Sequence, residues 1–170
     1  MNYVNVNKSA EQVARAIYKN IGQKMPSIYE LICWTEKNLG VKIKIRYAEL
    51  SPSTLGLTYH DPRTNTSSVW VRSSDSHPRQ NFTLCHEIAH IIRDYEEKYV
   101  FSDSNIFTKH GEERYCDRFA AAFLMPNDYF EERWNATNES TTIKKARTAK
   151  FFHVSVEAVN YRAKELGLIP

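Results

Sequence analysis

Two histidines and a glutamate have the spacing of a metal site in the segment His86-Glu87-Ile88-Ala89-His90. Residues four apart lie one turn apart on the same face of a helix, so the two imidazoles can reach one ion. Two nitrogen ligands at this spacing are typical of Zn²⁺. Glu87 follows the first ligand and is placed to act as general base on a water molecule that the metal activates. The pattern therefore predicts metal-assisted hydrolysis with Zn²⁺ as the cofactor.

The H-E-x-x-H pattern also arises by chance, and the alternative is a pair of hydrogen-bonded histidines in a protein core. The neighbouring residues favour the metal site because they predict a buried helix. Burying two histidines and a glutamate is costly unless they have partners. The apolar neighbours are Phe82, Leu84, Ile88, Ala89, Ile91 and Ile92.

A catalytic zinc site needs a third protein ligand and one open position. Glu113 is the candidate, at the start of a predicted second helix. Asp117 lies one turn later on the same side, where a carboxylate can accept a hydrogen bond from a ligating histidine. The alternative is that Glu112 and Glu113 are solvent-exposed residues in a first turn, where the helix dipole favours acidic groups. The residue pattern alone leaves this choice open.

The remaining pattern predicts helices before and after a small sheet, which is an α+β fold. Helical spacing, caps and breakers predict helices at 10–18 (with Ser9 as its N-cap), 26–39 (ending at Gly40), 80–95, 111–125, 127–134, 142–152 and 155–166. Alternating apolar residues predict strands at 41–47, 55–59 and 68–72, with the last two joined as a hairpin by the turn 61–65.

The two predicted site helices resemble those of the ImmA/IrrE family of metallo-endopeptidases. Residues 79–90 are similar to the family's R-x-x-F-T-x-x-H-E-x-x-H helix, and residues 113–126 to its E-x-x-A-[ND]-x-F-A-x-x-L-[LM]-M-P helix. The resemblance implies a zincin-like, minimal gluzincin core. It further implies Glu113 as the third zinc ligand, Glu87 as general base and Asp117 as a carboxylate supporting the ligands. Small residues replace other small residues where the chain departs from the pattern, at Ala89, Cys85 and Cys116.

The resemblance also implies a function for the whole chain. It suggests a zinc endopeptidase that cleaves a helix-turn-helix transcriptional repressor encoded beside it, as in phages and mobile elements. The expected division is a metallopeptidase core at 1–135 and a C-terminal helical pair at 136–170, similar to a helix-turn-helix. The alternatives are a non-proteolytic regulator that binds a repressor or DNA, and the toxin component of a toxin–antitoxin pair.

The charge of the chain bears on the DNA-binding alternative. The net charge of +3 is too small to indicate nucleic-acid binding by itself. The basic C-terminal residues keep DNA binding open, although packing of this helix pair on the core is favoured. These residues are Lys144, Lys145, Arg147, Lys150, Arg162 and Lys164.

No apolar run is long enough to span a membrane, and the N-terminus lacks the regions of a signal peptide, so we expect a cytoplasmic protein. Three cysteines without a CxxC pair argue against a disulfide framework. The sequence does not single out a donor that would stabilise the oxyanion of the reaction. The candidates are Tyr59, His60, His77, Arg79 and His110.

Overall fold

The computed structural model describes residues 6–22, 25–95 and 109–170, and within them it confirms the predicted α+β class. The helices are α1 (Val6–Ile21), α2 (Ile28–Leu39), α3 (His77–Tyr95), α4 (Lys109–Leu124), α5 (Asn127–Asn135), α6 (Thr141–Phe152) and α7 (Val156–Glu165). The strands are β1 (Lys42–Ala48), β2 (Gly56–Asp61) and β3 (Thr66–Arg72). None of the described helices is long and apolar enough to cross a membrane.

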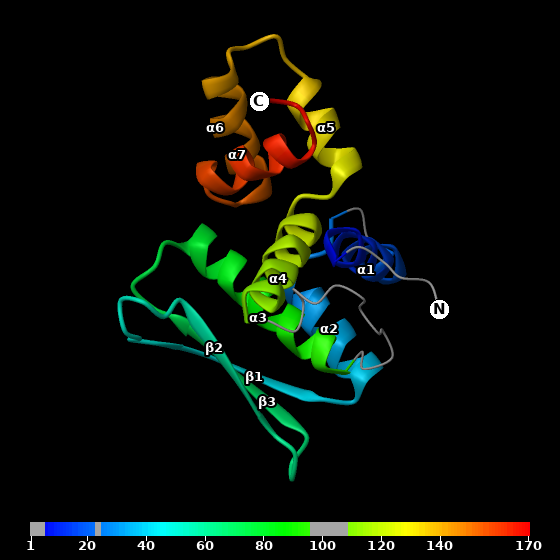
Figure 1. Ribbon diagram of the computed structural model, residues 1–170, viewed down its shortest axis with the longest axis vertical. Coiled ribbons are helices and arrows are strands. Elements are labelled where there is room, and N and C mark those ends of the chain that lie inside the picture. The colour runs from blue at the N-terminus through cyan, green and yellow to red at the C-terminus, as the bar shows by residue number, and fades with distance from the viewer. Residues whose placement is uncertain (1–5, 23–24, 96–108) are drawn as a thin grey trace.

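The three strands form one sheet in the order β1-β3-β2. β2 pairs antiparallel with β3, which confirms the predicted hairpin, whereas β1 pairs parallel with β3. β3 is therefore the central strand, and its Val69 and Val71 side chains are fully buried. α3 contacts β2, β3 and α4, so it lies between the sheet and α4 (Figure 1). This arrangement leaves β2 as an edge strand beside α3.

Local signals set the ends of several helices. Ser27 and Glu30 form a capping box at the start of α2, and Gly40 ends that helix with a positive φ of 68°. The predicted N-cap at Ser9 is wrong, because α1 already begins at Val6. An N-cap contributes only about 1 kcal/mol, so the backbone hydrogen bonds of an additional turn can outweigh it.

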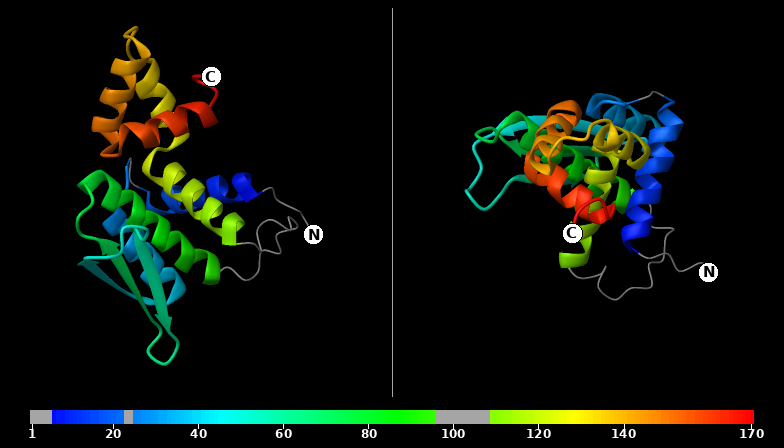
Figure 2. Two further views of the ribbon diagram at one scale, coloured as in Figure 1. Left: turned by 60° about the vertical axis from the view of Figure 1, so that its left-hand side comes forward. Right: turned by 90° about the horizontal axis from the view of Figure 1, so that it is seen from above.

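Buried side chains form two separate clusters. The larger one joins α1, α2, the sheet, α3 and α4. The second joins α5, α6 and α7 through residues that include Phe130, Trp134, Phe152 and Val159. Figures 1 and 2 show these three helices grouped at one end of the molecule, with the sheet at the other. α5 thus packs with the C-terminal helical pair.

Arg162 of α7 connects the two clusters. Its side chain is almost fully buried, and both of its terminal nitrogens donate to the Glu11 carboxylate of α1 at 2.8 Å. The same guanidinium donates to the Asn127 side chain at 2.7 Å and to the Met125 carbonyl at 3.1 Å. Arg118 of α4 also pairs with Glu165 of α7. The C-terminal helices are therefore held against the rest of the protein by buried polar contacts.

Replacing Arg162 by Ala should destabilise the protein by about 3 kcal/mol, because it removes a buried side chain and leaves the partly buried Glu11 carboxylate without its donor. The measurement is urea unfolding followed by circular dichroism. Lys164→Ala is the matched control, since it removes an exposed cation from the same helix. A loss below about 1 kcal/mol for Arg162→Ala would contradict the linking role of this side chain.

Candidate metal centre

α3 brings the two predicted histidine ligands together. The Nε2 atoms of His86 and His90 lie 3.2 Å apart, as expected for rings one turn apart on a helix. Both rings are largely buried, with 13% and 19% of their side-chain surface exposed. Burial and the nearby charge of His86 lower the pKa of His90, which favours the neutral imidazole that a metal requires.

Glu113 of α4 completes the group. Its Oε2 lies 3.2 Å from His86 Nε2, and its Oε1 lies 3.6 Å from His90 Nε2. Nitrogen and oxygen ligands of a tetrahedral zinc are about 3.3 Å from one another, given bond lengths near 2.0 Å. The three predicted ligands therefore fit a zinc ion. Glu112 lies elsewhere, because its carboxylate is 3.3 Å from Arg93 Nη1.

Asp117 orients the first of these ligands. Its Oδ1 lies 2.8 Å from His86 Nδ1, so a proton on Nδ1 can be donated to the carboxylate, and Nε2, the ring nitrogen beside Glu113, is then available to a metal. Burial by itself would lower the pKa of His86. The hydrogen bond and charge of Asp117, together with the charges of Glu87 and Glu113, outweigh the effect of burial and raise the pKa of His86. The arrangement agrees with the supporting role that the sequence predicts for Asp117.

The predicted general base is held by the sheet. Glu87 is only 7% exposed, and the hydroxyl of Thr58 on β2 donates to its Oε2 at 2.7 Å. Burial raises the pKa of Glu87, whereas the hydrogen bond from Thr58 and the charge of His86 oppose the increase. A buried carboxyl with a raised pKa is typical of groups that exchange protons during catalysis. No sequence signal identifies Thr58 as its partner.

Gly56 allows β2 to lie this close to α3. A Cβ atom built at Gly56 would be 2.7 Å from Thr83 Cγ2 and 2.9 Å from Glu87 Oε1. Any side chain at this position would therefore push the strand away from α3 or move the carboxylate. The residue was expected in the small sheet, but its contact with Glu87 requires knowledge of how the strand packs.

Cys116 is an additional candidate ligand that the sequence analysis treated as a small packing residue. Its Sγ and one ring nitrogen from each of His86 and His90 lie within 4.8 Å of one another. Cys116 and Cys85 are both buried, and burial raises the pKa of both thiols. Cys33 is exposed, and all three cysteines are free, as the absence of a disulfide pattern predicts.

The oxyanion-donor candidates are dispersed. Tyr59 is 60% exposed, and His77 Nδ1 lies 3.5 Å from the Asn81 side chain. His60 is on the same strand as Thr58, and its Nδ1 lies 3.0 Å from Ser67 Oγ. Arg79 faces a cavity near the start of α3. The side chain of His110 lies outside the described residues.

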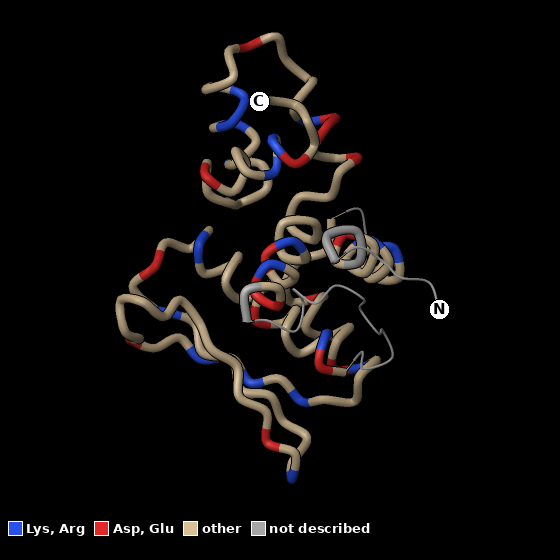
Figure 3. The backbone as a smooth tube through the Cα atoms, viewed as in Figure 1, with Lys and Arg blue, Asp and Glu red and all other residues tan. Residues whose placement is uncertain are grey.

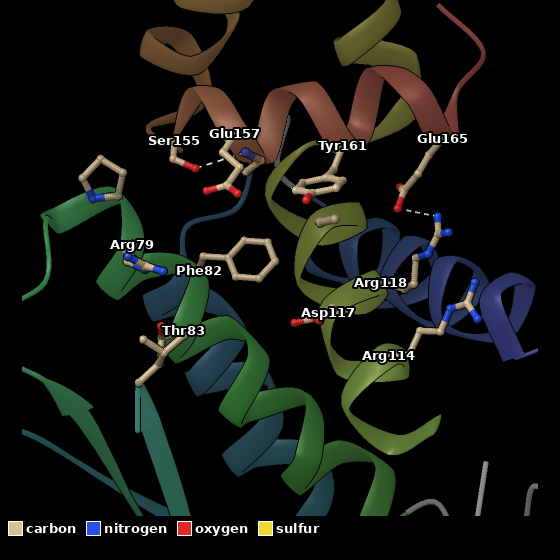
Figure 4. A pocket seen from close by; sticks show the side chains of 14 residues that line it. Arg79, Phe82, Thr83, Arg114, Asp117, Arg118, Ser155, Glu157, Tyr161 and Glu165 are labelled. Carbon is tan, nitrogen blue, oxygen red and sulfur yellow. Dashed lines mark hydrogen bonds and ion pairs between the residues drawn. The ribbon is translucent and has the colours of Figure 1, made fainter. Parts of the chain in front are cut away.

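Two cavities flank the metal-binding turns of α3. The first, of about 470 Å³, lies between α3, α4 and α7, and Figure 4 shows Phe82 and Tyr161 pointing into it. Asp117 and Thr83 also line it, close to the candidate ligands. The second, of about 380 Å³, lies at the other end of α3. Its lining residues are Thr58, His60, Ser67, Ile91, Asp94 and Tyr95.

Comparison with known proteins shows the family of the chain. The model of the M78 peptidases, described as the IrrE N-terminal-like domain, matches residues 39–164. The chain belongs to the M78 peptidase family. The expected ImmA/IrrE membership is thereby confirmed, and this M78 protein carries its candidate metal centre within the matched region.

Solved structures with a similar fold include a protein that regulates transcription. A Mycobacterium tuberculosis transcriptional regulator superposes on the M78 protein with a TM-score of 0.64 and 18% sequence identity. The similarity covers 95% of this chain but 47% of the regulator, so the chain spans about half of the regulator's length. None of the curated proteins compared with the chain matches it.

Replacing Asp117 by Asn should weaken zinc binding by about 10- to 100-fold, because His86 loses the carboxylate that fixes its tautomer and orientation. The measurement is competition for zinc with a chromophoric chelator. Asp128→Asn, which changes a highly exposed carboxylate on α5, is the control. Equal zinc affinities for wild type and Asp117→Asn would contradict the assigned contact.

Replacing Glu87 by Gln should stabilise the metal-free protein near neutral pH. The raised pKa means that folded Glu87 binds a proton more tightly than unfolded Glu87, so wild-type stability falls as pH rises from about 4.5 through the folded pKa. The stability that Glu87→Gln gains over wild type should therefore be small in acid and increase as the pH rises through this range. Thermal unfolding in the presence of a chelator measures the difference, with Glu157→Gln as an exposed control. A pH-independent difference would contradict the raised pKa.

Proposed function

We propose that this protein is a zinc-dependent endopeptidase that cleaves a helix-turn-helix repressor. The observation that carries the proposal is the position of Glu87. Its buried carboxylate, held by Thr58, stands next to a cluster in which His86, His90 and Glu113 present ligand atoms at distances that suit zinc. A buried acid beside three ligands is the composition of a hydrolytic metal site.

The residues divide the chemistry between them. A zinc ion bound here supplies an acidified water molecule and polarises the peptide carbonyl. His86, His90 and Glu113 would hold the ion, and Asp117 keeps His86 in the tautomer that leaves Nε2 available. Glu87 accepts the proton of the water molecule and delivers it to the leaving amine, a role that its raised pKa supports.

The surroundings suit an extended peptide. The described strands place β2 at the edge of the sheet, next to α3, so its outer backbone groups can pair with an added strand. The two cavities lie toward opposite ends of α3, with the candidate ligands between them. A substrate chain can therefore continue on both sides of the cleaved bond, which supports an endopeptidase over an exopeptidase.

The C-terminal helices support a role in substrate binding more than in DNA binding. Ser155, Glu157 and Tyr161 of the α7 region line the cavity next to the candidate metal centre. Arg162, one of the basic residues that kept DNA binding open, is buried and paired with Glu11. Figure 3 shows acidic residues beside the basic ones on α5 and α7, whereas α6 has basic residues without acidic ones. The mixed charges of α5 and α7 attract the DNA backbone weakly.

Regulation of transcription is the context that we propose for this peptidase. The resemblance to the ImmA/IrrE family implies a repressor as substrate, and one of the similar solved structures is that of a transcriptional regulator. The proposed substrate is accordingly the helix-turn-helix repressor encoded beside this gene.

The test is incubation of this repressor with zinc-loaded wild type and with Glu87→Gln, followed by intact-mass spectrometry. Wild type should produce two defined fragments, and Glu87→Gln should be slower by about 10²- to 10⁴-fold. Glu112→Gln is the matched control, because it removes an α4 carboxylate that faces Arg93 instead of the histidines. An intact repressor with zinc-loaded wild type would contradict the proposal. Binding of the uncut repressor or of DNA would then favour the non-proteolytic alternative.

A further inference from the structure

Cys116 lies at the base of the candidate metal centre. It is three residues after Glu113 on α4, so both side chains are on the same face of the helix. Glu113 and Asp117 have 47% and 60% of their side-chain surface exposed, whereas Cys116 is fully buried. The sulfur is therefore covered from solvent, unlike the two carboxylates.

The position of the sulfur relative to the histidines distinguishes Cys116 from the other buried cysteine. The Cys116 Sγ and one ring nitrogen from each of His86 and His90 lie within 4.8 Å of one another. Cys85 is just as buried and adjoins His86 in sequence, yet its sulfur is not part of this group. A zinc-bound sulfur lies about 3.6 Å from nitrogen ligands, so a small movement of the Cys116 side chain is enough to bring the sulfur into the coordination sphere.

The chemistry of the thiol favours this movement when a cation is present. A bound divalent cation favours the charged thiolate, because a coordinating thiol is deprotonated. The Sγ–H bond breaks, a bond from Sγ to the metal forms, and the proton leaves to solvent. No electron transfer and no further reactant are needed.

We infer that Cys116 is a fourth protein ligand of the metal, beside His86, His90 and Glu113. The inference extends the metal centre of the proposed function and rests on it. Four protein ligands fill the positions of a tetrahedral zinc, as in structural sites, whereas hydrolysis requires one open position. With four protein ligands the resting centre would be closed, and a water molecule would have to replace the Cys116 sulfur, which would take up a proton, before peptide cleavage could begin.

Cobalt substitution tests this inference without measuring activity. Co²⁺ replaces Zn²⁺ and reports a thiolate ligand by an intense near-ultraviolet charge-transfer band, in addition to visible bands that report bound metal. Wild type and Cys85→Ala should show the charge-transfer band. Cys116→Ala should lose it and keep the visible bands, because the two histidines and Glu113 still hold the ion. Titration of the metal should also release one proton fewer per ion in Cys116→Ala.

Extended X-ray absorption fine-structure spectroscopy at the zinc edge, carried out on the wild-type protein, is a second measurement that does not depend on a variant. It should show one sulfur at about 2.3 Å together with lighter ligands at about 2.0 Å. Visible cobalt bands without the thiolate band, or a zinc spectrum without sulfur, would overturn the role of Cys116 and leave the proposed peptidase intact. Failure of the wild-type protein to bind Co²⁺ and Zn²⁺ would overturn both the role of Cys116 and the proposed peptidase function. A thiolate band that persists in Cys116→Ala would assign the sulfur to another cysteine and overturn the inference.

Discussion

The packing of α4 across α3 is the constraint on which the candidate site depends. Both ring nitrogens of His86 face α4, with Nδ1 at Asp117 and Nε2 at Glu113, two carboxylates that are one turn apart. A slip of one turn between the helices would break both contacts. Fully buried small residues on the two helices, Ala89 and Ala120 among them, allow the close approach. Helix packing and ligand geometry are thus fixed by the same contact.

The same site carries an energetic cost. Glu87 is a buried carboxyl with a raised pKa, and its ionisation in the folded protein is opposed by burial. The hydroxyl of Thr58 offsets part of this cost, and the absence of a side chain at Gly56 makes the contact possible. Functional sites commonly retain such locally unfavourable groups because the rest of the fold holds them in place. Here the central buried strand β3 holds β2 in position.

The sequence predicted the parts of this arrangement that have a local signal. The spacing of His86 and His90, the apolar faces of α3 and α4, and the hairpin of β2 and β3 each follow from a short pattern. The parallel pairing of β1 with β3 has no such signal, because it depends on tertiary packing. The contacts of Thr58 and Cys116 were missed for the same reason. A single threonine or cysteine has no characteristic spacing, and its role depends on which element packs against it.

The central claim is that α3 and α4 together form a metal centre, and anomalous diffraction at the zinc edge tests it most directly. Crystals of the zinc-loaded protein should show one strong peak within about 2.2 Å of His86 Nε2, His90 Nε2 and a carboxylate oxygen of Glu113. The Asp117 carboxylate should remain hydrogen-bonded to His86 Nδ1. A map without a peak between the two helices, and with the imidazoles still in direct contact, would contradict the account.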